Sequence, residues 1–111
     1  MSTKHTPGPW SIWTSNSYRR IGSDAPRGGE VLCGSVQRDG CADLYFPNGG
    51  YEGPDARLVT AAPDLLASLR TTVSMLQGTL LIITDKDARA MAKEAIAEAR
   101  AAIAKATGEK A

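Results

Sequence analysis

The sequence predicts an α+β fold, in which a small N-terminal antiparallel β-sheet is followed by a C-terminal helical hairpin. Residues 1–53 are rich in Gly, Pro, Ser and aromatic side chains and show no helical period. Residues 54–111 are dominated by Ala, Leu, Ile and charged side chains at helical spacing. At 111 residues the chain is of single-domain size, so we expect one domain, 1–111, with a β-rich half and a helical half.

The first two strands are predicted by alternation of large and small side chains. Residues 10–13 (WSIW) place Trp10 and Ile12 on one face of a strand and Trp13 on the other. A turn at residues 16–17 is expected to lead into a short strand at 18–21 (YRRI).

A second hairpin is predicted after a loop at residues 22–29. Residues 30–38 (EVLCGSVQR) have the highest strand propensity in the chain. Asp39-Gly40 is typical of a type I′ hairpin turn, so residues 41–46 are expected to form the returning strand.

Residues 47–54 (PNGGYEGP) separate the two halves, and we expect no regular structure there. Residues 55–62 are predicted to form a short helix. Pro63 would remove a helical hydrogen bond, so we expect a break or a kink there, with Pro63-Asp64 as the first turn of a second helix. Apolar positions that continue this second helix at the spacing of one buried face are 65, 66, 69, 73, 76 and 80.

The last helix is predicted to run from about Lys86 to Thr107. Thr84 or Asp85 is expected as its N-cap, and Gly108 as a left-handed C-cap. Its apolar seam has the spacing of a coiled pair and consists of Ala92, Ile96, Ala99, Ile103 and Ala106. Two interpretations stay open: the seam packs on the preceding helix as an antiparallel hairpin, or it also binds a partner subunit.

Charge and composition exclude several classes of protein. A formal net charge of +1 is unlike that of a general polyanion binder, so no nucleic acid polymer is expected as partner. No apolar run approaches the roughly 20 residues of a membrane span, and the N-terminus resembles no secretory signal. We therefore expect a cytoplasmic protein whose Cys33 and Cys41 are reduced thiols; the alternative is a disulfide between them. With a single histidine, no zinc site of standard spacing can be formed, and no cofactor is expected.

No catalytic constellation is found, and we do not expect an enzyme. His5 lies in an N-terminal arm without an associated nucleophile, and the glycines at 49, 50 and 53 lack the lysine of a phosphate-binding loop. All six aromatic residues lie in the first half, together with several arginines. Guanidinium groups grip phosphates and aromatic faces stack on bases. The candidate ligand residues are Arg57, Arg19, Arg20, Arg27, Trp13 and Tyr18. The alternative is that the aromatic side chains belong to the core and the arginines are solvated surface.

Three segments carry a resemblance to a known family: HTPGPW (5–10), DARLVTAAPDLL (55–66) and AAIAKATG (101–108). They resemble a family of small phage and prophage proteins with the pattern HTPGPW, then (N/D)ARLxxAAPxLL, then a C-terminal AIAKA. Here Asp55 stands where Asn is common, and Thr60 where Ala or Ile is common. The resemblance implies a phage protein that acts in the cytoplasm of a bacterial host cell.

The order of a small sheet and a helical hairpin is also similar to the layout of phage Thoeris anti-defence proteins. That similarity implies a non-enzymatic sponge that forms homo-oligomers through its helices. Such a sponge sequesters a cyclic nucleotide immune signal, either a cyclic ADP-ribose isomer or a cyclic oligonucleotide. The alternative is an interaction module or inhibitor that binds a host protein through its helical face.

Overall fold

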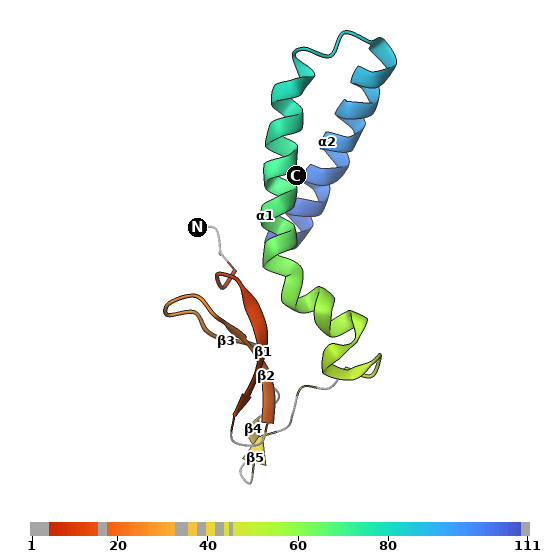
Figure 1. The fold of residues 1–111 in the computed structure, drawn as a ribbon. Helices are drawn as coiled ribbons and strands as arrows, with labels where there is room; N and C mark the ends of the chain where they lie inside the picture. Colours follow the sequence, from red (N-terminus) through yellow and green to blue (C-terminus); the bar gives the residue numbers. More distant parts are fainter. Residues whose placement is uncertain are drawn as a thin grey trace. The chain divides into compact units, whose positions relative to one another are not determined.

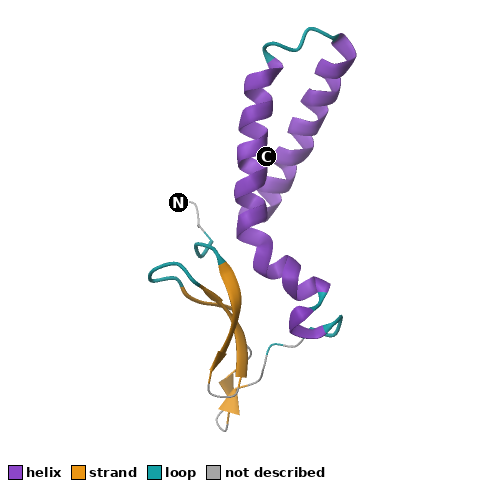
Figure 2. Cartoon of the chain, in the orientation of Figure 1, coloured by secondary structure: helices purple, strands orange, loops and turns teal. Residues whose placement is uncertain are grey.

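The computed structural model describes residues 5–15, 18–32, 36–37, 40–41, 44 and 46–109. In chain order the elements are β1 (Trp10–Ser15), β2 (Tyr18–Ser23), β3 (Gly29–Leu32), β4 (Val36–Gln37), β5 (Gly40–Cys41), the 3₁₀ turn η1 (Gly50–Glu52), α1 (Pro54–Leu80) and α2 (Lys86–Thr107). The strands precede the two long helices (Figure 1, Figure 2), which confirms the predicted α+β fold.

The chain forms two compact units, one of Thr6–Asp64 and one built on Leu65–Ala111. Helix α1 begins in the first unit and continues into the second. The expected single domain with a boundary at residue 53 stays a prediction.

The first unit contains a three-stranded antiparallel sheet in the order β1-β2-β3. Strand β1 pairs with β2 along its whole length, from Trp10 opposite Ser23 to Ser15 opposite Tyr18. Ile21 has no exposed surface and forms the centre of the buried face. Because side chains alternate along a strand, the neighbours Arg20 and Gly22 lie on the other face.

Parts of the strand prediction are wrong. Strand β2 continues through Ser23, so the loop predicted for residues 22–29 is shorter. Gly22 has low strand propensity, but in this sheet its missing side chain leaves room for the indole of Trp13. The strand predicted for residues 30–38 is divided into β3, which pairs with β2, and β4, which pairs with β5.

The predicted second hairpin also differs in register. Gly40 lies in β5 opposite Gln37 and is not a central turn residue. The described returning strand contains only Gly40 and Cys41. The predicted turn at residues 16–17, together with Cys33 and Asp39, lies outside the described residues.

The segment HTPGPW is held in place by hydrogen bonds that its backbone carbonyls accept. The indole Nε1 of Trp10 donates a hydrogen bond to the carbonyl of Thr6 at 3.1 Å. The Asp24 amide donates to the carbonyl of Pro9 at 2.8 Å, and the hydroxyl of Ser23 donates to the carbonyl of Pro7. Ser23 is only 2% exposed, so these bonds satisfy a polar side chain inside the unit.

Two predictions for the start of the helical half are wrong. Residues 50–52 form the 3₁₀ turn η1, and Pro54 is already the first residue of α1. Helix α1 does not break at Pro63 but continues through it. A proline inside a helix costs about 3 kcal/mol, and burial of its ring offsets part of this cost. The Pro63 ring is buried and lies so close to Gly8 that a Cβ at position 8 would come within 2.8 Å of it.

The second unit is an antiparallel helical hairpin, in which α1 and α2 lie side by side (Figure 1). Its core contains Val73 of α1 and Ala92 and Ile96 of α2. Ala99 and Ile103 are half-buried and Ala106 is exposed, so the predicted seam is only partly buried in the hairpin. Leu65 was expected on the buried face, but it is 52% exposed.

The ends of α2 confirm the prediction. A carboxylate oxygen of Asp85 accepts a hydrogen bond from the Ala88 amide at 2.7 Å, and Gly108 has the left-handed φ of 77° that ends the helix. Arg89 adds an unpredicted contact, since its Nη1 donates to the carbonyl of Leu80 at 2.7 Å. This contact places a cation at the C-terminus of α1, where the helix dipole favours it.

Candidate functional site

The sequence-predicted residues Trp13 and Arg20 are brought together in the sheet. They are directly opposite each other on β1 and β2. The guanidinium carbon of Arg20 lies 5.4 Å from the centroid of the indole, within the range of a cation–π contact. Trp13 is half-buried, so part of the ring remains accessible to a ligand.

The indole of Trp13 is held in place from two directions. Its Nε1 donates a hydrogen bond to Asp24 Oδ1 at 3.1 Å, and the hydroxyl of Ser11 donates to the same oxygen at 3.0 Å. Beneath the ring, a Cβ on Gly22 would lie only 2.1 Å from the indole carbons Cδ2 and Cε2. The aromatic plane is therefore fixed before any ligand arrives, which lowers the entropic cost of stacking.

Arg20 has an acidic partner on the neighbouring strand. Its Nε lies 2.9 Å from Glu30 Oε1, and the Arg20 side chain is 13% exposed. The pair is a close ion contact in which the Nε–H is not aligned with the oxygen. Glu30 neutralises much of the charge, so an anionic ligand at this place would have to compete with a carboxylate.

Arg19 belongs to a different cluster, because neighbouring residues of a strand point to opposite faces. Its guanidinium carbon lies 4.5 Å above the centroid of Tyr51. The hydroxyl of Tyr51 donates to the carbonyl of Leu44, and Phe46 meets the Tyr51 ring edge-on at 6.0 Å. The Leu44 amide in turn donates to the Arg19 carbonyl at 3.2 Å, which ties this segment to β2.

The remaining predicted site residues are Arg27, Arg57 and Tyr18. Arg27 is exposed in the turn between β2 and β3 with a φ of 62°, a left-handed conformation that is uncommon for arginine. Arg57 is exposed in the first turn of α1. The backbone of Tyr18 pairs with that of Ser15, but its side chain lies outside what the structure describes.

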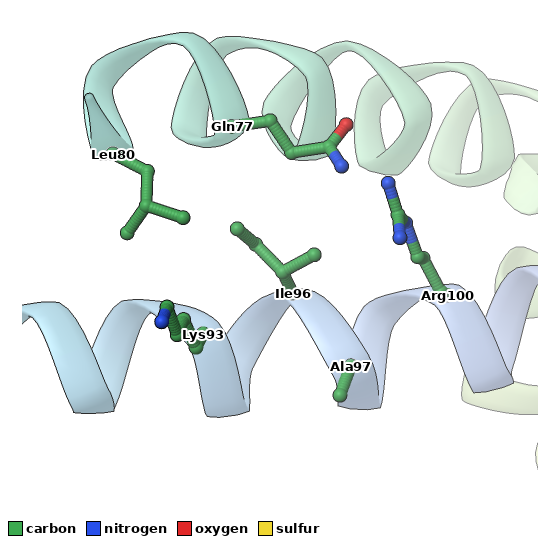
Figure 3. Close-up of a pocket in the computed structure, with 6 residues that line it drawn as sticks. All are labelled: Gln77, Leu80, Lys93, Ile96, Ala97 and Arg100. Atoms are coloured by element: carbon green, nitrogen blue, oxygen red, sulfur yellow. The ribbon is translucent and has the colours of Figure 1, made fainter.

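Sequence reasoning missed a groove in the hairpin (Figure 3). It has a volume of about 350 Å³ and is lined by Gln77, Leu80, Lys93, Ile96, Ala97 and Arg100. In Figure 3 the amide of Gln77 points toward the guanidinium of Arg100, and beside them Leu80 of the upper helix faces Ile96 of the lower one. The signal in the sequence was the spacing of Lys93 and Arg100, which are seven residues apart and so lie on one side of the helix.

Within the part of the chain that the structure describes, no three His, Cys, Asp or Glu side chains are grouped closely enough to hold a metal ion. Among the described residues, neither long helix is apolar enough to cross a lipid bilayer.

The chain is a small α+β protein, in which an antiparallel sheet is followed by a helical hairpin. Comparison of its sequence with family models identifies the family. The family model for Salmonella phage P22 protein Y8K6 matches residues 1–110. The chain belongs to this phage protein family, which confirms the prediction of a phage protein. No curated protein and no solved structure matches the chain.

Proposed function

We propose that this phage protein is a non-enzymatic, homo-oligomeric binding protein that sequesters a cyclic nucleotide immune signal in the cytoplasm of the bacterial host. The signal is a cyclic ADP-ribose isomer or a cyclic oligonucleotide. The observation that carries the proposal is the pair of cation–aromatic contacts that start from neighbouring residues of β2, Arg20 on Trp13 and Arg19 on Tyr51.

Nucleotides offer phosphate oxygens and flat bases, and the sheet offers complementary groups. A guanidinium donates two parallel hydrogen bonds to a phosphate, and an aromatic face stacks on any base. Both aromatic rings are held by hydrogen bonds, Trp13 to Asp24 and Tyr51 to the carbonyl of Leu44. A ring fixed in this way binds a base with little further loss of side-chain entropy.

In this mechanism the protein holds the ligand without breaking a bond. Trp13 stacks on a base and Arg20 contacts a phosphate, while Arg19 and Tyr51 offer the same pair of groups on the other face of the sheet. Arg57 adds charge where the first amides of α1 already favour an anion. The signal is removed from solution because it stays bound, and an oligomer multiplies the number of sites per particle.

Calorimetry of the full chain against a panel of cyclic nucleotides tests the proposal. We expect binding of at least one of them at micromolar protein, and binding of none would overturn it. Trp13→Ala should weaken binding by about 5- to 150-fold, because stacking on one base contributes about 1–3 kcal/mol. Trp13→Phe keeps a flat ring and should retain most of the affinity.

The contribution of Arg57 has a matched control on the same helix. Arg57 and Arg70 are both exposed arginines of α1. Arg57→Ala should reduce affinity for the nucleotide, whereas Arg70→Ala should leave it unchanged. Ligand recovered intact after denaturation is the outcome that a binding protein predicts, and a cleaved ligand would instead identify an enzyme.

A second candidate function is a module that binds a host protein through the helical half. It is favoured by Leu81 and Ile82, which follow α1 and are 83% and 77% exposed. Affinity capture from host lysate would test it, with a Leu81→Ser and Ile82→Ser double variant as the control. Retention of the same host protein by the double variant would exclude these two residues as the contact.

A further inference from the structure

Helix α2 carries a stripe of alanines beside the residues that face α1. We call Ala88, Ala92, Ala95, Ala99, Ala102 and Ala106 the alanine stripe; they are spaced by four, three, four, three and four residues. Ala88, Ala95, Ala102 and Ala106 are exposed, and only Ala92 is buried against α1. Met91, which borders the stripe, is 70% exposed.

Helix α1 carries a matching stripe with the same kind of spacing. Its members are Leu65, Ser68, Thr72, Met75 and Thr79, and all five are exposed. Met75 is 68% exposed and Leu65 is 52% exposed, large values for apolar side chains. Its other three members carry only small hydroxyl side chains, and neither stripe contains a charged residue.

The two stripes lie on one side of the hairpin. Thr72 comes one residue before the buried Val73, and Ala95 comes one residue before the buried Ile96. Each stripe is therefore turned by about 100° from the line of contact, in the same rotational sense. In two antiparallel helices the same rotation leads to the same side, so the stripes form one continuous surface. We call this surface the uncharged face.

The opposite side of the hairpin is polar and cationic. Gln77 comes four residues after Val73, and Arg100 comes four residues after Ile96, which turns both by about 40° in the opposite sense. Both line the groove of Figure 3, together with Lys93. The hairpin thus has one charged side suited to water and one uncharged side that is poorly suited to it.

We propose that the uncharged face binds the same face of a second copy of this chain, with the two α2 helices antiparallel across a two-fold axis. The spacing of the alanine stripe reads the same in both directions. An antiparallel copy therefore places Ala88 opposite Ala106, Ala92 opposite Ala102, and Ala95 opposite Ala99. A two-fold interface requires this self-complementarity, whereas an interface with an unrelated protein does not.

The dimensions of the face fit a stable dimer. From Ala88 to Ala106 the helix rises by about 27 Å, and two helices packed about 8–10 Å apart give a face roughly 20 Å wide. The flat area of such a face is about 540 Å² per partner, just above the roughly 500 Å² per partner that a specific interface requires. Alanine side chains let the two helices approach closely, so backbone and side-chain atoms both gain contacts.

A second copy also completes a core that is small in the single hairpin. Among the described hydrophobic residues from 65 onward, only Val73, Ala92 and Ile96 are buried. Helices gain most of their stability from packing an apolar face, and the dimer adds Leu65, Met75 and Met91 to the buried set. The inference rests on the homo-oligomer in the proposed function and names the face that forms it.

Sedimentation equilibrium of the full chain tests the face with a matched pair of substitutions. Ala95 lies in the centre of the alanine stripe, whereas Ala101 is an exposed alanine on the far side of the same helix. Ala95→Glu should weaken self-association by at least about 100-fold, because it buries like charges near the axis. Ala101→Glu should leave association unchanged. A monomeric parent chain, or equal association of both variants, would overturn the proposal.

Crosslinking tests the antiparallel register independently of any loss of folding. In chains whose Cys33 and Cys41 are replaced by Ser, one partner carries Ala88→Cys and the other Ala106→Cys. A short bis-maleimide should link the mixture into dimers, while either variant alone should give few. Efficient linking of Ala88→Cys to itself would overturn the register. Nucleotide affinity is measured separately, so a dimer that binds no nucleotide would contradict only the proposed function.

Discussion

Replacing Gly22 by alanine perturbs the proposed stacking site without altering any group that would contact a ligand. A Cβ at this position would lie 2.1 Å from Cδ2 and Cε2 of Trp13, and 2.5 Å from Cε3. Ordinary carbon contacts need about 3.5 Å, so the indole must move by more than 1 Å. The hydrogen bond from Nε1 to Asp24 is 3.1 Å long and would not survive this movement.

The size of the effect follows from the contacts that are lost. A hydrogen bond to a charged group contributes about 1.5–3 kcal/mol, and an exposed cation–π contact about 0.5–1 kcal/mol. We therefore expect Gly22→Ala to lower the free energy of unfolding of the first unit by about 2–4 kcal/mol. Affinity for a nucleotide should fall as well, because the stacking ring leaves its position.

The two units can be followed by separate signals. Both tryptophans of the chain lie in the unit Thr6–Asp64, so their fluorescence reports on the sheet, while far-UV circular dichroism is dominated by the helices. Gly22→Ala should shift the fluorescence transition in urea to lower concentration. An unchanged transition and an unchanged emission spectrum would show that the indole does not lie across Gly22.

Gly78→Ala is the matched control for this substitution. Gly78 lies inside α1, and a Cβ there would meet nothing within 4 Å. Alanine is favoured over glycine in a helix interior by about 1 kcal/mol. This variant should therefore raise the stability of the helical signal and leave the fluorescence transition in place.

Three further substitutions test other contacts. Arg89→Ala removes the hydrogen bond to the Leu80 carbonyl and should lower helical stability by about 1–2 kcal/mol in urea unfolding followed by circular dichroism; an unchanged midpoint would contradict the contact. Arg27→Gly relieves a φ of 62° and should stabilise the first unit by about 1 kcal/mol in the fluorescence assay, and a loss of stability would count against the left-handed turn. Gly8→Ala places a Cβ 2.8 Å from Pro63 and should lower the fluorescence midpoint, whereas no shift would exclude this packing.

Helix α2 was predictable from the sequence because its signals are local. The Asp85 cap, the spacing of Ala92 and Ile96, and the glycine at 108 each act within one or two turns of chain. The continuity of α1 was not predictable, since it depends on Gly8, which packs on Pro63 from more than 50 residues away. The same holds for Gly22, whose place in a strand depends on Trp13 of the neighbouring strand.

The candidate site was predictable only residue by residue. Strand alternation alone places Arg19 and Arg20 on opposite faces, so they could have been assigned to different clusters from the sequence. The side chains that contact these two arginines, Glu30 and Tyr51, could not be predicted from the sequence. Glu30 reaches Arg20 through the pairing of β2 with β3, and Tyr51 reaches Arg19 from within the breaker-rich segment 47–54.

Native mass spectrometry of the full chain, mixed with a panel of cyclic nucleotides, tests the central claim most directly. The proposed function predicts an oligomer that retains a stoichiometric nucleotide, which is released intact on denaturation. An oligomer that retains none of the nucleotides at micromolar concentrations would contradict it.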